Sequence, residues 1–284
     1  FQAEDGIRDP LWSRGLGDVY KRQPLINFCK DSNTIPRIHI KVDTGMTRLG
    51  LDINSFKYVI ELLIKHPEIQ CEGIYSHFAT ADEGDLSYAV DQEKKFKLIL
   101  DFIQKLDYSI KNIHFSNSGA TLNIKQDYCN ISRVGMLLYG VLPSNELERI
   151  LPVKPVLNFK APIVSIRSVP KNTFVSYGGA YKTTSETNIV VVQCGFADGL
   201  PRSWFENGYI YYNGNRHNIA GRICMDQFMV DFGNIIPKID DNVLMIGKDG
   251  SDEISFETIS NAVKSTPYAL ATAIGGRTQR IYQG

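Results

Sequence analysis

The chain has 284 residues, of which 43% are hydrophobic, and its formal net charge at pH 7 is zero. This length suggests one large or two modest domains. Because neither sign of charge is in excess, the composition argues against nucleic acid or a membrane surface as a partner. No apolar run approaches the roughly 18 residues of a membrane-spanning helix, and the start shows no signal peptide, so we expect a cytoplasmic protein.

The cysteines are few and dispersed, and no CxxC pair occurs. An odd, scattered set indicates reduced thiols in a reducing compartment, and it predicts neither a disulfide framework nor a metal site. The five are Cys29, Cys71, Cys129, Cys194 and Cys224.

Residues 1–23 show no helical or strand periodicity that continues into the following segment. They resemble the translated adaptor sequence found at the ends of some proteins from assembled sequencing reads. We interpret this segment as non-native and exclude it from fold reasoning. The alternative is an ordinary polar N-terminal extension.

From residue 24 to about 142 the pattern alternates between β-rich and helical segments. Strand-like runs cover 37–43, 69–78, 112–116 and 131–138. Apolar residues at i, i+3, i+4, i+7 and i+8 predict a helix after the first run, from Phe56 to Ile64, with Asn54 as its N-cap and Pro67 as its stop. A second helix follows the second run, with Phe96, Ile99, Leu100, Ile103 and Leu106 on one stripe, and a short helical turn covers 120–124.

The repeated order of strand and helix predicts parallel strands joined by crossover helices. Polar residues cluster where each strand ends, which is where TIM barrels build their active sites. Only about four of the eight strand–helix units of a complete barrel are visible. We therefore predict an α/β TIM-type barrel of which residues 24–152 supply the second half only.

Residues 153–284 have a different character, with short β-branched segments separated by turns. The pair Asn213-Gly214 predicts a tight β-hairpin. We expect a second, mainly β domain of about 130 residues, which is within the usual size range of domains.

Several candidate site residues follow the predicted strands. Lys41 and Arg48 lie around one glycine turn, and a pair of cations suits a carboxylate or phosphate ligand, although half of such loops are merely solvated. His77 follows the next strand, where a lone histidine is more often a hydrogen-bonded structural residue than a catalytic one.

Three further residues have two readings each. Ser118 adds a hydroxyl to a helix start, which is a phosphate cradle about as often as a plain N-cap. Arg133, in an apolar run, needs a partner if buried, and a structural ion pair would serve. Tyr177 stands beside a glycine turn and would need activating neighbours to act as a base near neutral pH, because its free pKa is near 10.

Taken together, the strings around these residues resemble those of one enzyme family. Over residues 24–284, and in a consistent order, the sequence is similar to the alanine racemases, pyridoxal-phosphate enzymes of fold type III. The resemblance implies interconversion of L-alanine and D-alanine with pyridoxal 5'-phosphate by a two-base mechanism, supplying D-alanine for peptidoglycan, in a homodimer whose subunits share each active site. The strings are KVDTGMTRLG (41–50), YSHFATADE (75–83), HFSNSGA (114–120), SRVGMLLYG (132–140), SYGGAY (176–181), CGFADGLPR (194–202), GRICMDQ (221–227) and ALATAIGGRTQRIY (269–282).

The resemblance implies catalytic roles for Tyr177, His77 and Arg48. Tyr177 would be a base that reaches into the partner's barrel, and His77 would orient it. Arg48 would contact the cofactor's phenolic oxygen and the substrate carboxylate, and Lys41 would be carbamylated so as to orient Arg48.

It also implies a set of cofactor-binding residues. Arg133 would face the pyridine nitrogen and leave it unprotonated, which weakens the ring as an electron sink and favours racemisation over transamination. The cofactor-binding set is Arg133, Ser118, Gly135, Met136, His114 and Tyr268.

In the second half of the chain, the resemblance gives the backbone N–H of Met225 to the substrate carboxylate, with Arg222 and Asp226 nearby. Two residues depart from the family pattern. Thr47 stands where glycine is common, from which we expect little consequence. Phe196 stands where tyrosine is common, so the entrance loses a hydroxyl.

The chain as printed contains no KANAYGHG-type string, the segment in which this family carries its Schiff-base lysine. We therefore expect that this chain cannot racemise alanine by itself. A broader-specificity or serine racemase and a non-catalytic cofactor-binding or assembly module stay open. A decarboxylase of the same fold is disfavoured because it normally has an acidic residue where Arg133 stands, and a phosphate-binding barrel leaves Arg133 and Tyr177 without a joint role.

Overall fold

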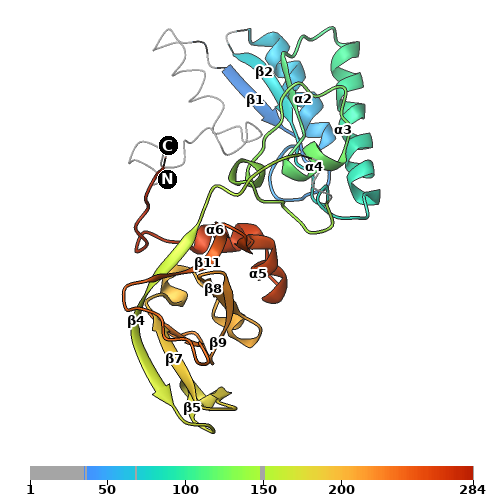
Figure 1. Cartoon of the computed structure of the whole chain (residues 1–284). Helices are drawn as coiled ribbons and strands as arrows, with labels where there is room; N and C mark the ends of the chain where they lie inside the picture. Colours follow the sequence, from blue (N-terminus) through green and yellow to red (C-terminus); the bar gives the residue numbers. More distant parts are fainter. Residues whose placement is uncertain (1–34, 36, 68, 148–150, 284) are drawn as a thin grey trace. The chain divides into compact units, whose positions relative to one another are not determined.

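The computed structural model describes residues 35, 37–67, 69–147 and 151–283, which form two compact units divided between Gly135 and Met136 (Figure 1). Residues 1–23, interpreted as non-native, and Cys29, predicted to be a reduced thiol, lie outside the described residues. The predicted boundary between the two domains, after residue 152, is not tested by this division into compact units. It stays a prediction.

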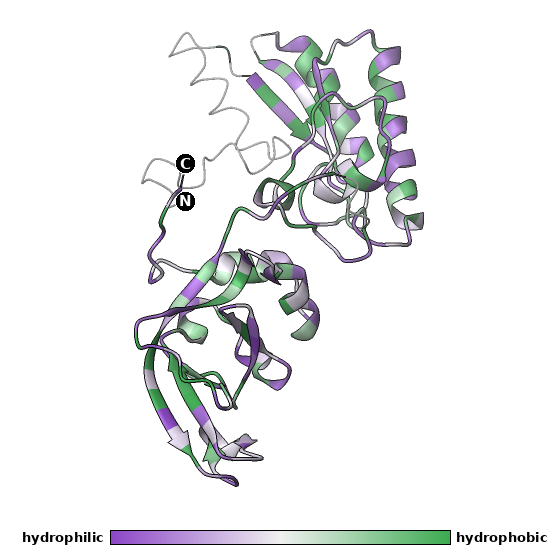
Figure 2. Ribbon diagram, viewed as in Figure 1, coloured by the Kyte–Doolittle hydropathy of each residue, from purple (hydrophilic) through white to green (hydrophobic). Residues whose placement is uncertain are grey.

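Unit 1 is built on three parallel strands, β1 (Arg37–Lys41), β2 (Gln70–Tyr75) and β3 (Asn112–His114), in that spatial order. Helices α2 (Ile53–Lys65) and α3 (Ser87–Lys105) provide the crossovers. Both helices bury their apolar stripes against the same face of the sheet, and Figure 2 shows hydrophilic and hydrophobic residues alternating along α3. Fully buried members of this core include Val42, Phe56, Ile60, Ile74, Phe96 and Phe115.

The start of α2 differs from the prediction. Its N-cap is Asp52, whose carboxylate accepts from the backbone N–H groups of Asn54 (2.8 Å) and Ser55 (3.0 Å). Asn54 lies inside the helix because a carboxylate two residues earlier already satisfies its N–H group. Ile64 and Leu106, which were assigned to the apolar stripes, are 46% and 37% exposed and lie at the margins of those stripes.

The predicted strand over 131–138 is wrong. Among the described residues the segment makes only two backbone bonds to the β3 edge, Asn130 N to Ile113 O (3.0 Å) and Arg133 N to Ser116 O (2.9 Å). The side chain of Asn130, rather than its backbone, accepts from Ile113 N (2.9 Å). This arrangement interrupts the ladder, and the chain then turns into a 3-10 helix, Met136–Tyr139.

Unit 2 is a seven-stranded antiparallel sheet with the order β12-β11-β4-β7-β10-β9-β8. A further pairing of β8 with β11 closes six of these strands into a barrel. The strands are β4 (Phe159–Val169), β7 (Thr187–Val192), β8 (Tyr209–Tyr212), β9 (Asn215–Ile219), β10 (Phe228–Asp231), β11 (Asn242–Asp249) and β12 (Asp252–Ile254).

Smaller elements complete unit 2. A two-stranded ribbon, β5 (Phe174–Val175) and β6 (Tyr181–Lys182), brackets a 3-10 turn at Tyr177–Gly179. Two more 3-10 helices span Phe196–Asp198 and Arg202–Glu206, and helices α5 (Phe256–Ala262) and α6 (Pro267–Ala273) follow the barrel. The barrel core includes Trp204, Ile163, Val190, Phe228, Met245 and Ile259.

The coarse fold prediction is confirmed: an α/β unit with parallel strands precedes a mainly β domain that contains a barrel. The hairpin prediction is confirmed too, because β8 and β9 meet at a two-residue turn. Asn213 (φ +48°) and Gly214 (φ +79°) both occupy the left-handed region that this turn type requires.

Candidate active site

The centre of the candidate site in unit 1 is Arg133, on the segment beside β3. Its Nη1 lies 2.7 Å from Nδ1 of His114, and its Nη2 lies 3.2 Å from Nδ1 of His77 and 2.7 Å from the carbonyl of Ser76. The guanidinium also lies over the Tyr75 ring, 5.3 Å from its centroid. None of the described residues offers Arg133 a carboxylate within ion-pair distance. The half-buried cation is therefore held by neutral acceptors alone, which excludes the structural ion pair within the described part.

The donor-only chemistry of arginine fixes the tautomers of its histidine neighbours. A guanidinium cannot accept a hydrogen bond, so Nδ1 of His77 and Nδ1 of His114 must both accept. Each neutral ring then carries its proton on Nε2. For His114 that proton is donated to Nδ1 of His39 at 2.7 Å, so His39 extends the network.

Both histidines are held in the neutral form. Burial, followed by the field of Arg133, lowers the pKa of His77 and that of His114 from 6.5 to about 4. His114 also stacks on Tyr75 with centroids 4.8 Å apart. His77 is consequently a neutral hydrogen-bond donor through Nε2 near pH 7.

The loop after β1 brings a second cationic group to the same place. Burial, followed by the charges of Arg48 and Arg133, lowers the pKa of Lys41, whose Nζ lies 5.9 Å from the Tyr75 centroid. Arg48 is exposed and forms no hydrogen bond or ion pair with another described residue. Its field nevertheless reaches both Lys41 and His77. Three cations therefore converge beside these strand ends.

Asp43 shapes this loop by accepting from the backbone N–H groups of Gly45 (2.8 Å) and Thr47 (3.1 Å). The expectation that Thr47 has little consequence for the site stays a prediction, but the structure shows an unusual backbone conformation at this residue. Thr47 has φ +57°, a left-handed conformation that is strained for a β-branched residue and open to glycine.

We expect Thr47→Gly to raise the free energy of unfolding by about 0.5–1 kcal/mol, because the relief of backbone strain exceeds the extra entropy of an unfolded glycine. Urea denaturation of the two proteins would measure the difference. Thr121→Gly is the matched control: Thr121 lies within α4 (Ser118–Asn123), where glycine should lower stability by about 1 kcal/mol. A loss of stability in both variants would contradict the strain at Thr47.

Ser118 begins α4 but is not its cap. Asn117 caps this helix, with Oδ1 accepting from Ala120 N at 2.9 Å. The Oγ of the buried Ser118 instead accepts from the backbone N–H of Gly135 (2.9 Å), which leaves its own proton available to another acceptor. Met136, the next residue, is buried in the core of unit 2.

Three sequence-predicted residues of unit 2 are exposed, Tyr177 and Met225 on turns and Tyr268 on helix α6. Tyr177 is 67% exposed, Met225 56% and Tyr268 43%. The Met225 turn packs against Gly195, where a Cβ would come within 2.1 Å of Met225 O, so no side chain fits there. No described residue accepts from the backbone N–H of Met225. This N–H is available to a ligand such as a carboxylate.

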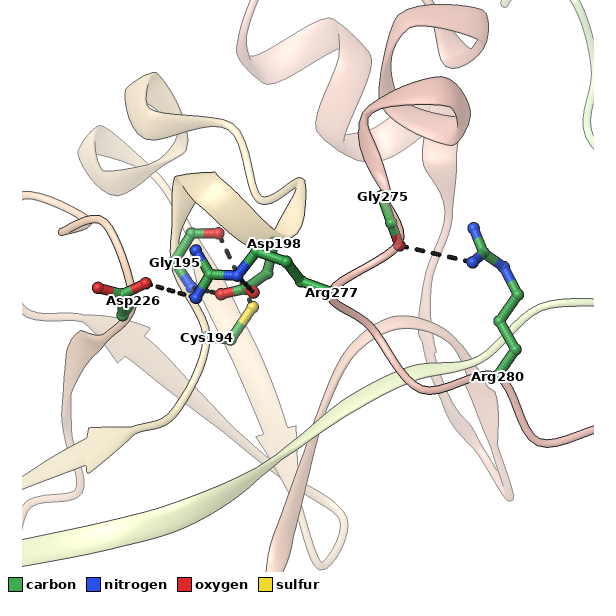
Figure 3. Close-up of polar contacts among 7 residues, drawn as sticks. All are labelled: Cys194, Gly195, Asp198, Asp226, Gly275, Arg277 and Arg280. Atoms are coloured by element: carbon green, nitrogen blue, oxygen red, sulfur yellow. Dashed lines mark hydrogen bonds and ion pairs between the residues drawn. The ribbon is translucent and has the colours of Figure 1, made fainter. Parts of the chain in front are cut away.

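Arg277 links the Met225 turn to the segment that contains Asp198 (Figure 3). It contacts Asp226 at 2.6 Å and Asp198 at 3.4 Å, and Asp198 also accepts from Gly195 N at 2.9 Å. Nearby, Arg280 donates to the carbonyls of Ile274 (2.9 Å) and Gly275 (3.5 Å). Arg277, in the C-terminal string, thus holds the Met225 turn against residues 195–198.

Phe196, the other departure from the family pattern, is 40% exposed and lies under the guanidinium of Arg202, 6.0 Å from its ring centroid. Because Phe196 is partly exposed in unit 2 and lacks the hydroxyl of a tyrosine, it presents an apolar ring that faces the Arg202 cation.

The structure brings together Lys41, His77, His114 and Arg133, with the field of Arg48 acting on the same cluster, and it separately joins Ser118 to Gly135. Three residues of these contacts, His39, Tyr75 and Arg277, are not among the residues singled out from the sequence. A signal for His39 was present, because it stands two residues before Lys41 and so shares its face of β1.

Two properties of the described residues bear on other functions. No helix in that part of the chain is long and apolar enough to cross a membrane. In the same part, no group of three histidine, cysteine or acidic side chains is arranged to hold a metal ion.

Comparison with known proteins connects both units to one family. Residues 18–143 match the family model "Alanine racemase, N-terminal domain", and residues 156–282 match "Alanine racemase, C-terminal domain". The first match includes residues 18–23, part of the segment set aside above.

Individual relatives agree with the family models. The alanine racemase of Halothermothrix orenii is 37% identical over 252 residues, which are 88% of this chain and 66% of the relative. The crystal structure of the alanine racemase of Streptomyces lavendulae superposes with a TM-score of 0.88 at 31% identity, covering 94% of this chain and 71% of that one. The alanine racemase of Bartonella henselae, solved with covalently bound pyridoxal phosphate, gives a TM-score of 0.80 at 27% identity over 93% and 71%.

The chain spans about two thirds of the length of the curated relatives that it matches. The two family models together cover nearly the whole described chain, and identity above 30% extends over more than two thirds of the S. lavendulae structure. The chain belongs to the alanine racemase family.

Proposed function

We propose that this chain forms the second part of a pyridoxal-phosphate-dependent alanine racemase. The observation that carries the proposal is the environment of Arg133, a half-buried guanidinium held by two neutral histidines and the backbone carbonyls of Ser76 and His114, with no carboxylate from the described residues. These four acceptors match the four N–H groups of Nη1 and Nη2, and Nε–H has no partner among the described residues. The guanidinium therefore keeps one permanent donor for a ligand atom, as a ring nitrogen that must stay unprotonated requires.

The chemistry of the donor set fits the cofactor. The Ser118 hydroxyl, with its proton available, would hold the phosphate, with Gly135 and Met136 beside it, and Tyr268 would add a contact from unit 2. Arg133 would face the pyridine nitrogen, with His114 supporting it. When bound, pyridoxal phosphate withdraws electrons from the α-carbon of an amino acid. Burial lowers the pKa of Arg133, but a guanidinium is not deprotonated in proteins, so Arg133 keeps its own proton throughout.

Tyr177 and His77 would handle the proton of the substrate. With its proton fixed on Nε2, His77 can donate to a phenolate oxygen but cannot accept from a phenol. A Tyr177 placed against it would therefore be favoured in the basic form, ready to take a proton from one face of the α-carbon. We propose that this pairing occurs across a homodimer, with Tyr177 reaching the partner's His77.

Arg48 and Met225 would bind the alanine carboxylate, the first through its charge and the second through its available backbone N–H. The lowered pKa of Lys41 favours the neutral amine, which is the form that carbon dioxide carbamylates. A carbamylated Lys41 would be an anion beside Arg48 and would orient it. Arg222 and Asp226, on the segment that carries Met225, would lie near the bound carboxylate.

The remaining features of the proposal follow the family. Unit 1, with three parallel strands described, would be the second half of an eight-stranded barrel within residues 24–152, and residues 153–284 would form the other domain. The protein would act in the cytoplasm and supply D-alanine for peptidoglycan. The base on the second face would be the cofactor-anchoring lysine, whose KANAYGHG-type string the printed chain does not contain.

The test is an assay of L-alanine to D-alanine conversion with added pyridoxal phosphate. It uses the chain joined to an N-terminal barrel segment that carries the anchoring lysine, called here the completed chain, with the printed chain as its control. We expect conversion by the completed chain and none by the printed chain. A completed chain that binds the cofactor and ignores alanine would contradict the proposal, and serine and lysine would then be tested as substrates.

A further inference from the structure

The turn that carries Tyr177 has an unusual backbone. Ser176 has φ +69° and ψ 177°, in a region that is open almost only to glycine, and Gly178 (φ +70°) and Gly179 (φ +58°) follow it. Two of these three positions are glycines, which adopt such angles without strain. The third is a serine, so the side chain at 176 must bring something that outweighs its strain.

What Ser176 brings is a bond to the GRICMDQ segment. Its Oγ donates to the carbonyl of Arg222 at 2.7 Å. Across the same contact, a Cβ added to Gly221 would lie 2.6 Å from the Cβ of Ser176, so only glycine at 221 allows the serine to approach. On the other side of Tyr177, a Cβ on Gly178 would lie 3.5 Å from the Arg222 guanidinium. The Tyr177 turn and residues 221–222 therefore interlock.

The base of the ribbon is fixed independently. The phenol of Tyr181, on β6, donates to the carboxylate of Asp231, which also accepts from Thr187 Oγ1 and from Gly233 N (2.9 Å). Val175, on β5, packs in a small cluster with Ile189 and Ala220. Because both strands are anchored to the barrel, the conformation of the exposed turn depends on what holds residues 176–179.

We propose that Ser176 is a positioning residue for Tyr177. Its hydroxyl holds the strained turn against Arg222 and thereby sets the direction of the Tyr177 side chain. Arg222 belongs to the segment that also carries Met225, so the same bond fixes the spacing between the two turns. The inference rests on the proposed function in that Tyr177 is taken as a base.

Two variants separate the hydroxyl from the strain. Ser176→Ala keeps the Cβ and its strain but removes the bond, and Ser176→Gly removes both. Hydrogen–deuterium exchange of the printed chain, followed in peptides that cover 174–182, needs no cofactor or activity. We expect the amides of the turn to exchange about tenfold faster in Ser176→Ala and also faster in Ser176→Gly, with exchange in the barrel strands unchanged. The control is Ser185→Ala, at an exposed serine of unit 2 without positive φ.

The completed chain gives the readout that a merely structural role would not move. In deuterated water, Ser176→Ala should slow α-proton exchange about tenfold for the alanine enantiomer that Tyr177 deprotonates. Exchange of the other enantiomer and the KM for alanine should stay near the values of the unsubstituted chain. Equal slowing for both enantiomers, or unchanged exchange in the 174–182 peptides, would overturn the inference. If Ser176→Gly behaves as the unsubstituted chain in both measurements, the hydroxyl is not needed and the inference fails.

The two proposals fail in different ways. A completed chain without racemisation or α-proton exchange defeats the proposed function, and the amide exchange of the printed chain then decides whether Ser176 holds the turn. Accelerated exchange in Ser176→Ala with unchanged enantiomer selectivity would leave Ser176 a stability determinant and refute its positioning role.

Discussion

Replacing Tyr177 by phenylalanine is expected to lower the racemisation rate of the completed chain by about 10²–10⁴-fold, the usual contribution of a general acid–base group. The substitution removes one oxygen from a side chain that is 67% exposed, so the fold should be retained. The two-base assignment makes a sharper prediction. One enantiomer of alanine should keep exchanging its α-proton with solvent, through the remaining base, while the other stops.

Nuclear magnetic resonance in deuterated water measures the two exchange rates separately. Tyr58→Phe is the matched control, because Tyr58 lies on α2, is 59% exposed and has no assigned role. A Tyr177→Phe protein that loses exchange of both enantiomers equally would be inconsistent with a base that serves one face. Retention of full racemisation would remove Tyr177 from the mechanism.

The second large effect concerns acid. His77 and His114 each have a pKa of about 4 in the folded chain against 6.5 when exposed, because burial and Arg133 oppose their protonation. The unfolded chain therefore binds more protons between these values, and stability must fall as the pH drops through that window. After a discount of about half for partial solvent exposure, we expect unit 1 to lose about 2 kcal/mol between pH 7 and pH 5.

Hydrogen exchange of unit 1 peptides at pH 7 and pH 5, corrected for the intrinsic pH dependence of exchange, would show the loss. The double variant His77→Gln, His114→Gln should be less stable at pH 7 but should show a much smaller difference between the two pH values. A double variant with the same pH dependence as the unsubstituted chain would mean that other groups bind the protons. That result would contradict the neutral state of His77 and His114 at pH 7, on which the role of Arg133 depends.

Local pattern was enough to predict most of the regular elements. The apolar stripe through Phe56 and Ile60 identified α2, and Asn213-Gly214 identified the β8–β9 hairpin, because both signals lie within a few residues. The start of α2 was harder to predict. Asp52 and Asn54 are both residue types that cap helices, and the choice between them depends on which one has the extended backbone of a cap. The strand predicted at 131–138 failed because the side chain of Asn130 interrupts a ladder whose existence depends on β3, seventeen residues earlier.

The candidate site, too, could be predicted from the sequence only in part. Arg133, His77 and Tyr177 could be singled out from the strings, but the tautomers of His77 and His114 follow only from which nitrogen meets Arg133. The strain at Ser176 and Thr47 was likewise invisible, because no residue type by itself reveals a positive φ. Helices α5 and α6, at seven residues each, are too short for periodicity to distinguish them from turns.

The closure of the barrel in unit 2 has a consequence for synthesis of the chain. Strand β4 begins at residue 159, and one of its two neighbours, β11, ends at residue 249 and also pairs with β8 to close the ring. While the ribosome is still adding the residues between them, one edge of β4 has no partner strand to bond with. An unpaired β edge on a nascent chain is exposed to pairing with other chains. Unit 2 therefore passes through its most aggregation-prone stage during translation, and it leaves that stage only when β11 has emerged.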